Sequence, residues 1–383
     1  MSAPGSTASL RTANQRRVVE ALRASTASEL SQAEISRATQ LAPATVSNIV
    51  KDLSAAGFLE SESGAGRRGA QVKIALGAGL VAGVDFGHSH LQIALGDLSG
   101  SVLATVVRPL KSQHDHTEGL ALASDLLDKL LAGQGVARSE LRAVGMGLPA
   151  PIGNSGTIDS GSILPGWVGV NAAEIAAETF GVPTLVDNDA NLGALAESTL
   201  GVGVGITSMA YLKISSGVGC GLILDGKVFR GGLGTAGEIG HLTREENGPL
   251  CRCGSRGCLE AYVGADALIA QFASRQPDIT TSELIALALG GDTGAKRLIE
   301  DAGRYLGRAA AILANVLGLE LFVIGGDMIA AGDLLFDGVR NGIRRDALDP
   351  VAKTVRVERA ALSDKSSAIG SLLFALEAVE LPS

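Results

Sequence analysis

Four residues within one stretch of this chain are of the types that hold a metal ion. His241 is followed by Cys251, Cys253 and Cys258. Imidazole nitrogen and thiolate sulfur suit tetrahedral zinc, and four protein ligands leave no position open for water. The alternative is a disulfide with a spare thiol, but three cysteines cannot pair evenly and the N-terminal residues do not resemble a secretion signal. The spacing therefore predicts a closed, structural zinc site.

Polar residues near these ligands could bind a sugar. Glu238 and Glu260 flank the cluster, and Asn188 and Asp189 follow a predicted buried strand. Carboxylates and amides suit a polyol, because each hydroxyl both donates and accepts hydrogen bonds. Asp189 could act as a general base on a hydroxyl; the alternative is that Asn188 or Asp189 only caps the following helix. The predicted sugar-binding set is Asn188, Asp189, Glu238, His241 and Glu260, with zinc as the brace for both glutamates.

Glycine-containing turns in three places could hold a nucleotide. Each follows a predicted strand, and glycine lets backbone N–H groups approach a phosphate without a side chain in the way. Two such turns facing each other would hold Mg-ATP across a cleft. Each turn is explained equally well as a tight hairpin. The predicted nucleotide-binding residues are Asp85, Gly87, Ser216, Gly217, Gly219, Gly325 and Gly326.

The N-terminal segment has the pattern of a DNA-binding domain. A helix from Asn14 precedes two short amphipathic helices, of which the first has a capping-box pair at Ser31 and Glu34 and the second begins at Pro43. The three-residue turn between them is typical of a helix-turn-helix, and a strand, an arginine-containing loop and a second strand add a wing. The predicted DNA contacts are Thr45, Ser47, Asn48 and Lys51 on the second helix, and Arg67 and Arg68 at the wing tip.

Charge is distributed unevenly and supports this assignment. Residues 1–80 contain nine Lys or Arg and six Asp or Glu, a net charge of +3, whereas the whole chain carries −8. We therefore expect nucleic acid to meet only the N-terminal part. The alternative is a three-helix bundle with a solvated charged face. Because no apolar run approaches the roughly 20 residues of a membrane span, we expect a cytoplasmic protein without a membrane partner.

Beyond the N-terminal segment, predicted strands and helices alternate, which indicates an α/β fold. Two strand–glycine-turn–strand hairpins each open a lobe, so two related halves should face each other across a cleft. The chain of 383 residues is long enough for this arrangement. The predicted domains are a winged helix-turn-helix at 1–76, a first lobe at 77–198 with a C-terminal helix at about 365–383 packing back on it, and a second lobe at 199–364 that contains the zinc stretch.

The segments GEIGH at 237–241 and CRCGSRGCLE at 251–260 resemble the signature of the ROK family of bacterial repressors and sugar kinases. The resemblance spans residues 81–383, and the winged helix in front is similar to the repressor branch, with its xylose-type and N-acetylglucosamine-type members. It implies a two-lobed, actin-like (ribonuclease-H-like) ATPase/sugar-kinase fold. It also implies zinc and sugar on the residues named above, with Asp189 at the position of the kinase base.

The chain departs from the family kinases where they bind phosphate. Their first turn is similar to Asp-x-Gly-Gly-Thr-Lys, whereas residues 85–90 read Asp-Phe-Gly-His-Ser-His. The second turn, 215–219, has Ser-Ser-Gly-Val-Gly where kinases resemble Gly-Thr-Gly-x-Gly. A bulky His88 and the missing lysine weaken the grip on ATP.

We therefore expect a sugar-responsive regulator, a repressor of carbohydrate metabolism. It would bind operator DNA and a sugar or sugar phosphate as a homodimer or tetramer. The first alternative is an ATP-dependent, zinc-containing sugar kinase that uses Asp189 and Mg-ATP. A DNA-binding protein whose second part only dimerises is disfavoured, because all five sugar-contact positions are present.

Overall fold

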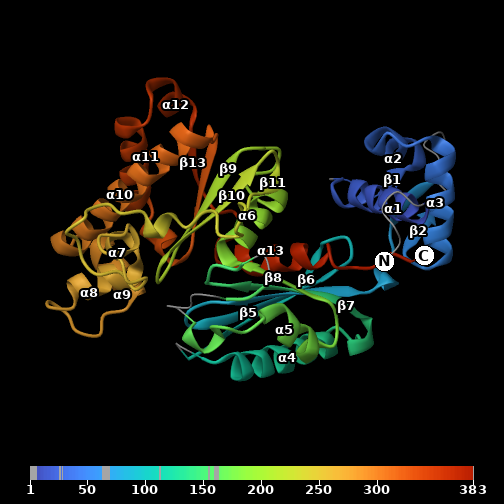
Figure 1. Cartoon of the computed structure of the whole chain (residues 1–383), viewed down its shortest axis with the longest axis horizontal. Coiled ribbons are helices and arrows are strands. Elements are labelled where there is room, and N and C mark those ends of the chain that lie inside the picture. The colour runs from blue at the N-terminus through green and yellow to red at the C-terminus, as the bar shows by residue number, and fades with distance from the viewer. Residues whose placement is uncertain are drawn as a thin grey trace.

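The chain folds around one small and two larger β-sheets in the part that the computed structural model describes, which is residues 7–25, 27, 29–62, 70–111, 114–153, 156–158 and 164–382. The small sheet belongs to an N-terminal domain at one end of the molecule, and the two larger sheets form the two lobes (Figure 1). Within these residues, no helix is both long and apolar enough to cross a membrane.

The N-terminal domain is a winged helix-turn-helix. Its buried face is built from Val46, Ile49, Val50 and Leu53 of the third helix. The predicted capping box is confirmed, since the Ser31 hydroxyl accepts from the Glu34 amide and the Glu34 carboxylate accepts from the Ser31 amide. The first helix starts seven residues before the expected Asn14. The elements are α1 (Thr7–Arg23), β1 (Leu30–Ser31), α2 (Gln32–Thr39), α3 (Pro43–Ala55), β2 (Leu59–Glu62) and β3 (Gln71–Ile74).

The two lobes repeat one topology. In each five-stranded sheet the first three strands form an antiparallel meander, and the last two add parallel to the other side of the first strand. This repeat agrees with the two related halves that the hairpins predict. The first sheet, in the order β6-β5-β4-β7-β8, has β4 (Leu80–Phe86), β5 (His90–Asp97), β6 (Val102–Pro109), β7 (Leu141–Leu148) and β8 (Thr184–Asn188). The second, in the order β11-β10-β9-β12-β13, has β9 (Met209–Ile214), β10 (Val218–Leu224), β11 (Lys227–Val228), β12 (Leu321–Gly325) and β13 (Arg356–Arg359).

Helices complete both lobes. Apolar residues of α4 and α5 share the core of the first sheet, and α8 to α11 share that of the second. The elements α11, α12 and β13 were not predicted. The predicted domain limits stay predictions; residue 77 lies in the 3-10 helix Leu76–Ala78 and residue 198 lies inside α6. The helices are α4 (His116–Gly133), α5 (Ala172–Phe180), α6 (Asp189–Leu200), α7 (Glu260–Val263), α8 (Ala265–Phe272), α9 (Thr281–Leu289), α10 (Thr293–Leu317), α11 (Asp333–Asp346) and α12 (Asp349–Thr354).

The helix α13 (Ser366–Ala375) lies between the first sheet and α6, where Figure 1 draws it in red. The packing is so close that three contacts leave no room for a Cβ atom. A Cβ on Gly83 would lie 2.1 Å from the Ala368 carbonyl oxygen, one on Gly145 1.9 Å from that of Ser371, and one on Gly370 1.8 Å from that of Leu192. Glycine at these positions is what allows backbone to meet backbone.

The C-terminal part of α13 and the segment after it join the N-terminal domain to the first lobe. Val18, Val19 and Leu22 of α1 share one hydrophobic cluster with Leu372, Leu376 and Val379. Hydrogen bonds add to this contact: Gln15 Nε2 donates to the Pro382 carbonyl at 3.3 Å, and Arg23 donates to the carbonyls of Leu98 and Leu376 at 2.9 and 3.4 Å. The winged helix is therefore packed on the lobe and shares its core.

The glycine contacts of α13 predict an unusual effect of alanine. Alanine in place of glycine normally favours a helix, but Gly370→Ala should lower the free energy of unfolding by roughly 1–3 kcal/mol because its methyl group meets the Leu192 backbone. The matched control is Gly133→Ala at the end of α4, where no atom lies within 4 Å of a Cβ. Thermal unfolding followed by circular dichroism should show a lower Tm for the first variant and an unchanged or higher Tm for the control. Equal Tm values would contradict the close-packing account.

Candidate functional site

A cavity of about 320 Å³ lies between the lobes and contains all five residues of the predicted sugar-binding set. The N-terminal end of α6, the turn between β4 and β5, the turn between β9 and β10, and the segment 235–260 form its walls. This volume lies at the lower end of the roughly 300–1,000 Å³ that is usual for small-ligand sites. The cavity residues among the predictions are Asn188, Asp189, Glu238, His241 and Glu260, together with Gly87, Ser216, Gly217 and Gly219.

Asp189 is buried at the first turn of α6, and its carboxylate is paired. Lys213 Nζ lies 2.7 Å from Asp189 Oδ2 and 3.9 Å from Asp85 Oδ2. Burial disfavours the charged ammonium, but the two carboxylates outweigh this effect and raise the pKa of Lys213. The lysine is therefore a permanent cation at the floor of the cavity. Sequence reasoning missed Lys213, although a lysine inside the apolar strand before the second glycine turn was a usable signal.

Asn188 caps the helix α6, which is the alternative to sugar binding that the sequence also allows for it. Its side-chain oxygen accepts hydrogen bonds from the amides of Ala190 and Asn191, which makes it the N-cap of α6. Its Nδ2 donates to the Ala150 carbonyl at 3.1 Å. An amide nitrogen has two N–H groups, so the second can still serve a ligand hydroxyl. Capping and ligand binding are thus compatible here.

Glu238 and His241 lie together on one wall. His241 Nε2 is 3.8 Å from Glu238 Oε2, while His241 Nδ1 faces Cys251 Sγ at 3.7 Å. Burial raises the pKa of Glu238 to about 7, and the negative charges of Asp189 and Glu260 add to this shift. At such a pKa the carboxyl group is present in both protonation states near neutral pH, so it can donate to or accept from a hydroxyl.

Glu260 connects the metal-ligand stretch to the second glycine turn. Its Oε1 lies 2.8 Å from Arg252 Nε, and its Oε2 accepts from the Val218 amide at 3.1 Å. A Cβ on Gly217 would lie 2.3 Å from Oε2, so only glycine leaves space for this carboxylate. Both carboxylate oxygens of Glu260 have protein partners, and the residue is only 5% exposed. The structure therefore makes Glu260 a wall of the cavity and an anchor of the turn.

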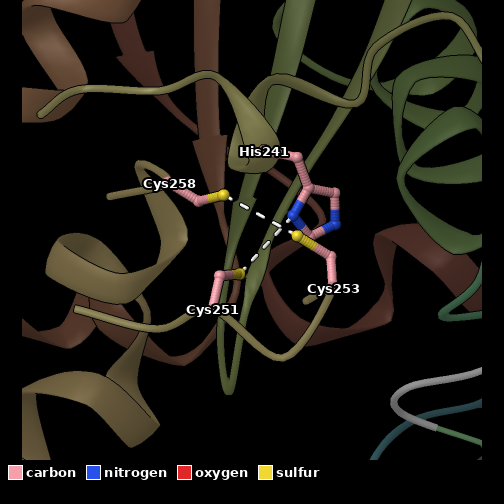
Figure 2. Close-up of side chains that lie close together, drawn as sticks. All are labelled: His241, Cys251, Cys253 and Cys258. Atoms are coloured by element: carbon pink, nitrogen blue, oxygen red, sulfur yellow. Dashed lines mark hydrogen bonds between the residues drawn. The ribbon is translucent and has the colours of Figure 1, made fainter. Parts of the chain in front are cut away.

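His241, Cys251, Cys253 and Cys258 converge as the spacing predicts (Figure 2). Their candidate ligand atoms all lie within 4.8 Å of one another. Cys251 Sγ is 3.7 Å from His241 Nδ1, and Cys253 Sγ is 3.7 Å from Cys258 Sγ. Metal–sulfur bonds of about 2.3 Å at tetrahedral angles place two sulfurs about 3.8 Å apart, so the four donors fit a tetrahedral ion. The cluster could bind a metal.

The predicted nucleotide residues divide into two groups. Gly87, Ser216, Gly217 and Gly219 line the cavity. The Gly87 amide is already used, since it donates to the His90 carbonyl at 2.8 Å, and the His90 ring lies against Gly87. Gly325 and Gly326 are glycine for packing reasons. A Cβ on Gly325 would meet the Tyr211 hydroxyl at 2.1 Å, and one on Gly326 the Ile214 carbonyl oxygen at 2.4 Å.

The helix α3, which carries four of the predicted DNA contacts, lies in the N-terminal domain at one end of the molecule (Figure 1). Ser47, Asn48 and Lys51 are exposed, and Thr45 is partly buried beside the α2–α3 turn. Arg67 and Arg68 lie outside the described residues, so the wing-tip contact stays a prediction.

Comparison with known proteins covers both parts of the chain. A model of the ROK family matches residues 81–378, and a model of the MarR family matches residues 11–69. The solved structure of a ROK family transcriptional regulator, a homologue of the Escherichia coli MLC protein, has a TM-score of 0.82 at 24% identity and covers 96% of both chains. This similarity shows the fold: a winged helix followed by an actin-like, two-lobed domain.

Relatives include both regulators and a kinase. The xylose repressor of Caldicellulosiruptor bescii is 28% identical over 362 residues, covering 90% of each chain. The DNA-binding transcriptional dual regulator NagC of Escherichia coli K12 is 32% identical over 364 residues, covering 89% of this chain and 87% of NagC. A glucokinase of Halalkalibacterium halodurans is 31% identical over 309 residues, covering 75% of this chain and 92% of the kinase.

The cysteine cluster predicts a spectroscopic result. Protein refolded or exchanged with Co²⁺ should show the intense visible bands of a tetrahedral, thiolate-bound ion, and Cys253→Ala should lose them because one of the four donors is removed. Cys220→Ala is the matched control, since Cys220 is a buried cysteine outside the cluster. Absorption titration with Co²⁺ measures both. Identical spectra for the two variants would contradict the assignment.

Proposed function

This chain belongs to the ROK family, and we propose on that premise that it is a sugar-responsive transcriptional repressor. The relatives named as a repressor and as a transcriptional regulator match it over about nine-tenths of its length. The glucokinase matches three-quarters of it. Alignment across both parts supports a regulator in which one part binds DNA and the other senses a sugar.

The shared core of the two parts carries this proposal. Side chains of α1 pack in one cluster with β4, β5 and α13, and α13 reaches the cavity at its other end, where the Ser367 hydroxyl donates to the Asp189 carbonyl at 3.0 Å. A change at the cavity can therefore reach the DNA-binding domain through packed side chains. A sugar acts in this way only if it binds one arrangement more tightly than the other.

We propose that the ion in the cysteine cluster is zinc and that its role is structural. Three thiolates and one imidazole are a usual donor set of closed zinc sites, and all four positions are protein ligands. The ion would hold His241 by Nδ1 and leave Nε2 toward Glu238, and it would fix the loop that carries Arg252 and Glu260. Zinc would thus set the shape of one cavity wall.

Operator binding would use α3 in a major groove, with the wing on the adjacent backbone. Asn48 and Ser47 are of the kind that reach base edges, and Lys51 of the kind that binds phosphate. We propose a homodimer, because two such helices related by a twofold axis match a near-palindromic site. A tetramer would bind two such sites.

Sugar phosphorylation is the second candidate, and the geometry disfavours it. The candidate base Asp189 is present and is paired with Lys213 at 2.7 Å, so the phosphate site, and not the base, disfavours phosphorylation. The first turn, where the kinases bind phosphate, is covered by the His90 ring. Binding of a sugar is still supported, since the cavity retains the five predicted contact residues.

DNA binding should depend on α3 and respond to one sugar. On duplex DNA from upstream of the protein's own coding sequence, Lys51→Ala should weaken binding and reduce the salt dependence by about one released counterion, and Asn48→Ala should cost roughly 1–3 kcal/mol and relax sequence preference. Fluorescence anisotropy measures the affinity of each variant for this DNA. Adding D-glucose, D-xylose or N-acetyl-D-glucosamine measures the response of that affinity to sugar.

Lys353→Ala is the control for that experiment, because Lys353 is an exposed lysine on α12 in the second lobe. It should bind DNA as the wild type does. If Lys51→Ala and Lys353→Ala bind equally well, α3 does not recognise the operator. If no sugar of the series changes DNA binding, the sensing role is wrong.

The kinase candidate is tested by ADP release with the same three sugars and Mg-ATP. We expect no turnover above the rate without sugar, because the His90 ring covers Gly87 in the first turn, where the kinases bind phosphate. Sugar-dependent turnover that Asp189→Asn abolishes would overturn the regulator-only proposal.

A further inference from the structure

Lys213 joins four elements at the floor of the cavity. It extends from β9 of the second lobe to Asp189 of α6 at 2.7 Å, to the Ser367 hydroxyl of α13 at 3.2 Å, and toward Asp85 of β4 in the first lobe. Only 14% of its side chain is exposed. One buried ammonium group thus faces a carboxylate from each side of the inter-lobe cavity.

Asp85 is a buried carboxylate whose two cationic partners both lie at long ion-pair distances. It is 1% exposed, and its nearest cationic atoms, Lys213 Nζ and His90 Nε2, lie 3.9 and 3.8 Å from Oδ2, beyond hydrogen-bond length. Within the residues that the structure describes, Oδ1 accepts no hydrogen bond. A buried carboxylate gains much from a close cation, so Asp85 is a ready second partner for Lys213.

We propose that Lys213 is a two-position cation, which moves from Asp189 to Asp85 when a sugar hydroxyl binds Asp189. This inference rests on the proposed sugar-sensing function and deepens it. In the arrangement described, Lys213 is the hydrogen-bond donor to Asp189 Oδ2. A sugar hydroxyl that donates to the same oxygen competes with the lysine, which then needs to move only about 1 Å to reach hydrogen-bond distance of Asp85.

Charge and hydrogen bonds balance in this exchange. Asp189 loses an ammonium donor and gains a hydroxyl donor, while Asp85 gains the ammonium donor. No proton is transferred between these groups. Lys213 stays paired with a carboxylate in both positions, which avoids an unpaired buried charge. The exchange requires only a neutral polyol, so a phosphate on the sugar is not needed for the switch.

Movement of Lys213 would act on both lobes and on α13. Asp85 belongs to β4, so a closer contact draws β9 of the second lobe toward the first lobe. The same movement alters the contact with Ser367, and α13 is packed tightly against β4 at Gly83. The other end of α13 shares a core with α1 of the DNA-binding domain. The switch therefore has a direct physical route to the winged helix.

The test is the coupling between sugar and DNA. D-glucose, D-xylose and N-acetyl-D-glucosamine are each titrated into the full-length protein with and without the operator duplex, and the ratio of the two Kd values is the coupling factor. Wild type should give a factor of at least about five for one sugar. Asp85→Asn keeps the shape but removes the second partner, so its factor should fall below about two. A uniform change in sugar affinity cancels in this ratio.

Two further variants complete the experiment. Lys213→Met should lose the coupling as Asp85→Asn does, and Lys227→Met, at an exposed lysine of β11, should keep it. The Tm of Asp85→Asn should lie well above the temperature of the binding experiment, because an amide of the same shape replaces the buried carboxylate. This Tm shows that a lost coupling does not come from unfolding.

The outcomes separate this inference from the function it rests on. A wild type whose DNA binding ignores all three sugars overturns the proposed function and the switch with it. A wild type that responds, together with an Asp85→Asn variant of equal coupling factor, overturns the switch alone. A crystal structure of the sugar complex with Lys213 Nζ still on Asp189 Oδ2 would also overturn it.

Discussion

Close contact between the α13 backbone and its neighbours is the constraint on which the arrangement of the parts depends. Glycine lies at the contacts with β4 and β7 and within α13 itself, so that this helix fills the space between the first sheet and α6 without intervening side chains. Such contacts leave little freedom, because interiors at native density transmit small displacements and do not absorb them. The N-terminal end of α13 reaches the cavity, and its C-terminal end reaches the winged helix.

The cavity is lined by more carboxylates than cations, since Lys213 and Arg252 accompany Asp189, Glu238, Glu260, Asp266 and Asp327. Asp189 pairs with Lys213, Glu260 with Arg252, and the neighbouring Asp187 with Arg230 at 2.6 Å. These carboxylates offer oxygen acceptors to hydroxyl groups, and the net negative charge of the lining disfavours a polyanion. Such a site suits an uncharged polyol better than a polyphosphate, which would need uncompensated cations and free backbone amides.

Much of the fold could be predicted from the sequence, and the pattern of success has physical causes. Local signals such as the Ser31 capping box and the Cys and His spacing predicted structure correctly, because their partners lie within a few residues. The five residues of the predicted sugar-binding set do lie around one cavity, and their role stays a prediction. Gly325 and Gly326 looked like phosphate turns, but their neighbours Tyr211 and Ile214 are distant in sequence. The role of Lys213 likewise depends on Asp85 and Ser367, which only the tertiary fold brings near it.

The shared core of α1 and the C-terminal segment has a consequence for biosynthesis. Gln15 and Pro382, whose contact closes this core, are 367 residues apart in sequence. A ribosome delivers the winged helix first and the residues that cover its inner face after both lobes have been translated. Nascent chains therefore carry an uncovered apolar face on α1, and the winged helix reaches its final packing only once both lobes and the C-terminal segment exist.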